Sequence, residues 1–174
     1  MSEPTASEPQ TPAPASTAPE NQRIFLVVVD ESPELKVALR YACLRARKSR
    51  GRVALLYVLE PAEAQSWLAV ENLMREEQRS EAEQKLQKLA REVNTLTGGT
   101  MPILYIREGD ARDELTALIQ EEPRISILVL GAGTGPEGPG PLITYFTGRG
   151  VTRLHIPVTV VPGGLTDEQI DAIT

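Results

Sequence analysis

The sequence predicts a single α/β domain with a five-stranded, mostly parallel sheet and helices on both faces, a three-layer doubly wound arrangement. Five short runs rich in valine, isoleucine and leucine recur along the chain. They are continuous rather than alternating, as expected for strands covered on both faces. Helical patterns separate these runs, and strands that alternate with helices form right-handed parallel crossovers. The runs are Ile24–Val29, Val53–Leu59, Pro102–Ile106, Ile125–Leu130 and Val158–Val161.

The first helical pattern follows the first strand. Ser32 and Pro33 fit an N-cap and a first helical residue, and Gly51 is expected to end the helix. Leu35, Leu39, Cys43 and Ala46 share one face at spacings of three or four residues. We therefore expect Cys43 to be a core residue rather than a nucleophile or a redox site.

Two later helices have recognisable ends. Asp110 is the expected N-cap of a helix over Ala111–Glu121, which Pro123 closes. Near the C-terminus, Thr166 and Gln169 fit a capping box. This pattern predicts a short helix within residues 164–174, starting at Asp167.

The segment 62–97 is long for a crossover between two strands. Leu86, Leu89, Val93 and Leu96 lie at helical spacing and predict a face that packs on the sheet. A separate apolar cluster precedes them, formed by Trp67, Leu68, Val70, Leu73 and Met74. Two interpretations stay open: the cluster covers the edge of the sheet, or it forms a lid or contact surface above the strand ends.

The charge of the chain is concentrated at its two ends. The net charge is −6, yet residues 23–164 hold 18 basic and 18 acidic side chains and are neutral. A neutral body lacks the electrostatic footprint of generic nucleic-acid binding. A local basic cluster over Arg45–Arg52 is interpreted as cations that favour a helix C-terminus.

Residues 1–22 are rich in proline, serine, threonine, alanine and glutamate and are predicted to be a disordered tail. The tail lacks the basic and apolar regions of a secretory signal. The single cysteine excludes an intramolecular disulfide, and no run of 18 apolar residues occurs. We therefore expect a cytoplasmic protein with no membrane partner.

Polar residues follow four of the predicted strands. In an open parallel sheet, ligands bind at the carboxyl ends of strands where the strand order reverses. The segments at these ends are Asp30–Ser32, Glu60–Pro61, Glu108–Asp110 and the residues from Gly131 onward. One histidine and one cysteine cannot build a typical zinc site, and neither a GxSxG elbow nor a Gly-Lys pair occurs. No protein-ligated metal and no catalytic residue is therefore predicted.

A glycine-rich segment follows the fourth predicted strand. Residues 131–150 read GAGTGPEGPGPLITYFTGRG and contain seven glycines and three prolines. Such a loop can expose backbone N–H groups to a phosphate. A GxGxxG pattern occurs at Gly133, Gly135 and Gly138, but a dinucleotide fingerprint belongs after the first strand, so the pattern is weak evidence.

The order and spacing of these elements resemble the universal stress protein family. RIFLVVVDESPELKVALRYA is similar to the family's first strand and helix, and VALLYVLEP to its second strand. REGDARDELTALIQEEPRISILVLGAGTG and IPVTVVP resemble the later elements through the last strand. The resemblance implies a domain over residues 23–163, a sheet order of 3-2-1-4-5, and homodimers formed through the last strand, Pro157–Val161.

The resemblance also implies a nucleotide site, because many members bind ATP or AMP and others do not. In binding members, the aspartate after the first strand and backbone near the end of the second face the adenosine. A pattern G-x2-G-x9-G-[S/T] holds the ribose and phosphates. Asp30 and Val58 match the adenosine side, and Gly131 matches the first glycine. In that register, Thr134 and Thr144-Tyr145 replace the remaining pattern residues.

A second register restores the glycine spacing with Gly135, Gly138 and Gly148 and puts Arg149 in the Ser/Thr place. Gly133 belongs to the same candidate phosphate loop. Arg149 is the only cation among residues 131–150 and would supply the main charge complementarity to phosphates. The three prolines lack N–H groups, so the loop has fewer donors than an intact pattern. Both registers stay open.

The leading functional hypothesis is a stress-response adaptor that binds ATP or AMP at the carboxyl ends of the first and fourth strands. It is not expected to be an enzyme, and any ATP hydrolysis would be slow and incidental. The alternative is a protein-interaction module on the same fold, because fold alone does not supply function. In that case the proline-stiffened loop and residues 62–81 bind an unidentified protein partner.

Overall fold

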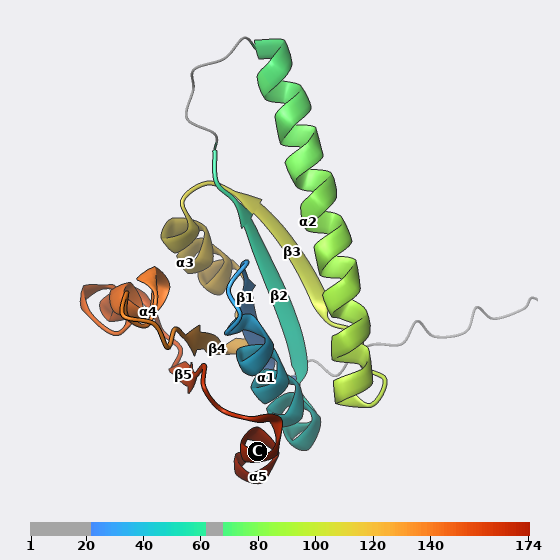
Figure 1. The fold of residues 1–174 in the computed structure, drawn as a ribbon, viewed down its shortest axis with the longest axis vertical. Helices are drawn as coiled ribbons and strands as arrows, with labels where there is room; N and C mark the ends of the chain where they lie inside the picture. The colour runs from blue at the N-terminus through green and yellow to red at the C-terminus, as the bar shows by residue number, and fades with distance from the viewer. Residues whose placement is uncertain (1–21, 62–67) are drawn as a thin grey trace, which may run out of the picture.

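The structure is a computed structural model that describes residues 22–61 and 68–174 (Figure 1). The strands are β1 (Ile24–Val29), β2 (Arg52–Leu59), β3 (Ile103–Glu108), β4 (Ile125–Ala132) and β5 (Val158–Pro162). The helices are α1 (Leu35–Ser49), α2 (Leu68–Thr97), α3 (Ala111–Glu121), α4 (Pro141–Phe146), the 3-10 helix η1 (Arg149–Arg153) and α5 (Asp167–Ile173). The predicted tail lies outside the described residues, apart from Gln22.

The sheet has the order β3-β2-β1-β4-β5, and every neighbouring pair of strands is parallel. This confirms the predicted fold class and strand order. The fourth strand is longer than predicted, because Gly131 pairs with Val161 and Ala132 with Pro162 of β5. The first two residues of the glycine-rich segment are therefore part of the sheet.

Helices cover both faces of the sheet and produce two hydrophobic cores. Phe25, Val27 and Val29 of β1 belong to the core that includes buried residues of α1 and α2. Ile24 and Leu26 belong to the other core, under α3 and α4. Successive side chains of a strand point to opposite faces, so a strand covered on both sides needs a continuous apolar run. No helix within residues 22–61 and 68–174 is both long enough and apolar enough to cross a bilayer.

The start of α1 differs from the prediction. Its N-cap is Glu34 rather than Ser32, and the Glu34 side chain makes no capping bond. Ser32 instead donates from its N–H and its hydroxyl to Oδ1 of Asp30, at 2.9 and 2.7 Å. An aspartate can bond the backbone two residues ahead in a turn, and this competes with a helix cap.

Two neighbouring residues at the end of α1 have different structural roles. Arg50, not Gly51, adopts the left-handed conformation, with φ of 54°. Gly51 is buried, and a Cβ there would lie 2.7 Å from the carbonyl oxygen of Arg23. The glycine at this position therefore permits close approach of two chain segments.

Helix α2 is continuous over 30 residues and extends beyond the end of the sheet (Figure 1). Leu86, Leu89 and Val93 are buried, and Leu96 packs partly against the same core, as predicted. The N-terminal part of the helix is different. Val70, Leu73 and Met74 are exposed by 49, 58 and 45%, so these residues do not cover the sheet edge. Trp67 lies outside the described residues, and the side chain of Leu68 is not described.

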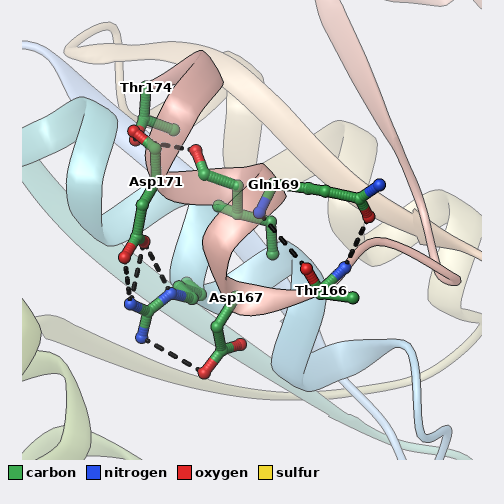
Figure 2. Close-up of polar contacts among 7 residues, drawn as sticks. Thr166, Asp167, Gln169, Asp171 and Thr174 are labelled. Carbon is green, nitrogen blue, oxygen red and sulfur yellow. Dashed lines mark hydrogen bonds and ion pairs between the residues drawn. The ribbon is translucent and has the colours of Figure 1, made fainter.

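Helix α5 begins with the predicted capping box (Figure 2). The N–H of Gln169 donates to Oγ1 of Thr166 at 3.3 Å, and the N–H of Thr166 donates to Oε1 of Gln169 at 2.9 Å. The predicted C-terminal helix is therefore confirmed.

Helix α5 is held against α1 by one buried residue and one arginine. Ile170 is fully buried. Arg40 of α1 donates to both carboxylate oxygens of Asp171, at 2.9 and 2.8 Å, and lies 3.6 Å from the carboxylate of Asp167 (Figure 2). The hydrogen bonds from Arg40 hold the pKa of Asp171 below its ordinary value.

Candidate functional site

The strand order creates a reversal point at the centre of the sheet. From β1 the chain crosses first to β2 and β3 on one side, and later to β4 and β5 on the other. Crossovers that leave in opposite directions open a crevice at the carboxyl ends of the central strands. In this chain, that crevice lies beyond the ends of β1 and β4.

A cavity of about 780 Å³ lies at this position. Its size is within the range of small-molecule sites, roughly 300–1,000 Å³. Apolar walls come from the ends of β1, β2 and β4, from α1, and from the start of α4. The apolar lining residues include Val29, Leu35, Val58, Leu130, Leu142 and Ile143.

The polar lining is dominated by acids. The lining includes five carboxylates and one guanidinium, that of Arg112. Ser32 and Gln78 add uncharged polar groups. The carboxylates are those of Asp30, Glu31, Glu60, Glu81 and Asp110.

Asp30 is positioned by contacts on two sides. Its Oδ1 accepts both bonds from Ser32, and its side chain is exposed. Lys85 of α2 donates to the backbone carbonyl of Asp30 at 2.6 Å and also pairs with the carboxylate of Glu31. These bonds fix the loop after β1 and join it to α2, while Oδ2 of Asp30 has no protein partner among the described residues.

Asp110 and Arg112 line the cavity from the N-terminus of α3. Asp110 is the N-cap of α3, as predicted, and accepts from the N–H groups of Arg112 and Asp113 at 2.9 and 3.2 Å. The guanidinium of Arg112 lies 5.0 Å from the centre of the Tyr145 ring, a distance typical of a cation–π contact.

The glycine-rich segment is folded largely onto itself. The N–H of Gly133 donates to the carbonyl of Pro139 at 3.1 Å, and the N–H of Gly138 donates to the carbonyl of Gly135 at 3.3 Å. The N–H of Gly148 donates to the carbonyl of Tyr145 at 3.2 Å. These three N–H groups are therefore already bonded within the segment.

Other reactive groups of the described residues lie away from the cavity lining. Cys43 is a buried core side chain, and its burial raises the pKa of the thiol to about 12. His155 is exposed and follows η1. Within residues 22–61 and 68–174, no group of three or more His, Cys, Asp or Glu side chains is placed to hold a metal ion.

Comparison with known proteins decides the family. The family model described as the universal stress protein family matches residues 22–162. The chain belongs to the universal stress protein family. No curated protein sequence matches the chain.

Solved structures share the fold of this family member. Universal stress protein UspA from Lactobacillus plantarum is similar with a TM-score of 0.65 and 21% identity, covering 81% of this chain and 98% of that one. The universal stress protein from Archaeoglobus fulgidus in complex with dAMP has a TM-score of 0.54 and 18% identity, covering 81% and 98%. A universal stress protein in complex with cAMP has a TM-score of 0.53 and 19% identity, covering 82% and 98%.

Three of the candidate site residues predicted from the sequence line the cavity: Asp30, Val58 and Gly131. The other five are not among its lining residues, so their role as phosphate ligands stays a prediction. They are Gly133, Gly135, Gly138, Gly148 and Arg149. Arg149 is exposed at the start of η1.

Several lining residues were not predicted from the sequence. The glycine-rich segment contributes Pro139–Ile143 rather than the remaining positions that the family pattern assigned to it, and α2 contributes Gln78 and Glu81. The strand-end rule did point to Glu60 and Asp110. A lid above the strand ends was one open interpretation of the apolar cluster in this segment, but a single continuous helix α2 whose middle reaches the strand ends was not predicted.

Proposed function

We propose that this universal stress protein is a cytoplasmic stress-response adaptor that binds the adenosine part of AMP or ATP in the strand-end cavity. One observation carries the proposal. A cavity of about 780 Å³ lies at the reversal point of the strand order and is lined by Asp30, Val58 and Gly131. These are the positions that the family resemblance assigns to the adenosine side and to the first glycine.

The chemistry of the lining fits a nucleoside. Apolar side chains such as Val29 and Leu35 can pack against the faces of a base, which is planar and largely apolar. A carboxylate oxygen accepts hydrogen bonds from ribose hydroxyls, and Oδ2 of Asp30 is available for this while Oδ1 is engaged by Ser32. Fold relatives solved with dAMP and cAMP support the assignment of ligand class.

The proposed role is binding rather than catalysis. The described lining offers carboxylates, one arginine, one glutamine, one tyrosine and one serine, and that serine is hydrogen-bonded to Asp30. A nucleophile needs a base within hydrogen-bond reach that draws off its proton, whereas Ser32 here donates within a turn. Any ATP hydrolysis is expected to be slow and incidental.

Calorimetry with adenosine and AMP tests the proposal. The wild-type protein should bind both, and Asp30→Ala should weaken adenosine binding by about 1.5–3 kcal/mol for a lost charged hydrogen bond. Asp30→Asn keeps an oxygen for the bonds from Ser32, so it separates loss of the carboxylate from loss of the turn. Glu137→Gln, an exposed change outside the cavity lining, is the control.

The alternative function is a protein-interaction module. The observation that favours it is the exposed apolar face of α2 formed by Val70, Leu73 and Met74. In this version α2 and the glycine-rich segment bind an unidentified protein. No detectable heat or thermal shift with millimolar adenosine, AMP and ATP would make it the better proposal.

We also propose that the protein is a homodimer formed through Pro157–Val161. Within the described residues, β5 pairs only with β4 and so leaves one edge open, and Val160 is 37% exposed. Open edges of this kind pair with other strands, and a lysine on an edge disfavours pairing. Light scattering should give a dimer mass for the wild type and for Leu73→Lys, a control on α2, but a monomer for Val160→Lys. A wild-type monomer at micromolar concentration would refute the dimer.

A further inference from the structure

The cavity at the ends of β1, β2 and β4 has an excess of negative charge that a phosphate-binding site would not have. Among its described lining residues, Arg112 is the one cation. The carboxylates come from separate elements, since Asp30 and Glu31 follow β1, Glu60 follows β2, Glu81 belongs to α2 and Asp110 caps α3. Negative groups therefore surround the cavity on several sides.

Nearby cations offset only part of this charge, because two basic side chains, Lys85 and Arg112, stand against five carboxylates. Lys85 is occupied by the carbonyl of Asp30 and the carboxylate of Glu31. Arg112 lies over the ring of Tyr145. Arg149, the only cation of residues 131–150, is not among the cavity-lining residues.

The segment that the family pattern assigns to the phosphates has some of its backbone donors already occupied. The N–H groups of Gly133 and Gly138 bond to carbonyls within the glycine-rich segment. Pro139 and Pro141, which line the cavity, have no N–H. Phosphate sites in α/β folds depend on such free N–H groups and on nearby cations.

Like charges repel over about 10 Å at roughly 0.1 M ionic strength and over longer distances at lower salt, and added salt screens the repulsion. Adenosine is neutral, whereas each added phosphate brings negative charge into an acidic cavity. We infer that the cavity selects its ligand by charge and prefers adenosine to AMP, AMP to ADP, and ADP to ATP. This inference rests on the proposed function, because it names the ligand form that the same cavity takes.

Calorimetry of adenosine, AMP, ADP and ATP, in EDTA and at two salt concentrations, tests the inference. Affinity should fall along the series, with ATP weaker than adenosine by roughly tenfold in about 0.05 M NaCl. The difference should narrow in about 0.5 M NaCl, where screening is stronger.

A charge variant assigns the effect to the cavity. Glu60→Gln with Glu81→Gln removes two lining carboxylates and should narrow the adenosine-to-ATP affinity ratio by roughly threefold to tenfold. Glu76→Gln with Glu83→Gln removes the same charge from exposed positions of α2 outside this lining and should leave the ratio unchanged.

The outcomes separate the inference from the proposed function. ATP or ADP binding in EDTA and low salt as tightly as adenosine would overturn the charge inference and leave adenosine binding intact. An unchanged ratio in the Glu60/Glu81 variant would overturn it as well. Absence of binding by all four ligands would overturn the proposed function, and the inference with it.

Discussion

Helix α5 and the glycine-rich segment 131–150 both carry short sequence patterns, yet only one of these patterns determines the local structure. In α5, the capping box of Thr166 and Gln169 forms as the sequence predicts. In the glycine-rich segment, two registers of the family pattern fit the sequence, and the segment instead extends a strand and bonds to itself. The difference lies in how far apart the interacting residues are in the chain.

The pattern of α5 is local. The two residues of its capping box are three positions apart, and each satisfies a backbone N–H of the other (Figure 2). The helix then packs on α1 through Ile170 and Arg40. A short-range signal is sufficient here because the partners are already adjacent in the sequence.

The glycines of residues 131–150 depend on distant partners. A Cβ on Gly131 would lie 2.5 Å from the carbonyl oxygen of Glu34, so this glycine permits β4 to approach the start of α1. Gly135, by contrast, has no atom within 4 Å of an added Cβ. The segment contains seven glycines, and the sequence alone does not show which of them permits a close backbone contact and which does not.

The largest effect is expected from an alanine at Gly131. The new methyl group collides with backbone atoms of Glu34, at 2.5 Å from the oxygen and 3.0 Å from the carbonyl carbon. Overpacking of this kind costs about 1–3 kcal/mol. Urea unfolding of Gly131→Ala should show that loss, whereas Gly135→Ala should stay within about 0.5 kcal/mol of the wild type. Equal losses of unfolding free energy in Gly131→Ala and Gly135→Ala would show that the two glycines do not differ in their structural role.

A smaller effect is expected at the start of α5. Thr166→Ala removes the cap and should cost about 1 kcal/mol, with faster hydrogen exchange of the α5 amides. Thr95→Ala is the control, because its exposed hydroxyl only bonds back to the carbonyl of Arg91 within α2. Unchanged exchange in α5 of Thr166→Ala would show that the capping box does not stabilise the helix.

The smallest effect concerns pH. The Arg40 guanidinium lowers the pKa of Asp171 from its ordinary value of 3.8. A carboxylate whose pKa is depressed in the folded state stabilises that state above the unfolded pKa, and the contribution is lost as pH falls through the folded pKa. Contact between α5 and α1 should therefore weaken only below pH 3.8.

An NMR titration of the Asp171 carboxyl carbon measures this shift. The midpoint should rise in Arg40→Gln, because the hydrogen bonds to the guanidinium are lost. Arg124→Gln breaks a different pair, with Glu122, and should leave the midpoint of Asp171 in place. An unchanged midpoint in Arg40→Gln would contradict the assigned cause.

The sequence predicted the fold well because the signals for it are regular. Continuous apolar runs, helical spacing and caps such as Asp110 are all properties of neighbouring residues. The candidate site was predicted in part. Asp30, Glu60 and Gly131 follow from their positions after strands, but Glu81 lines the cavity only because α2 runs past the strand ends as one long helix. Ser32 was wrongly predicted to cap α1, because its N–H and hydroxyl bond to the Asp30 carboxylate instead.

An NMR titration can locate the ligand on the protein. In a titration of labelled protein with adenosine, we expect the largest amide shifts at Asp30–Ser32, Val58–Glu60 and Gly131, around the cavity. The amides of α5 should not move, and those of Gly135, Gly138 and Arg149 should move little. Large shifts at these last three residues, with none at Asp30 and Val58, would contradict the account and return the binding site to the glycine-rich loop.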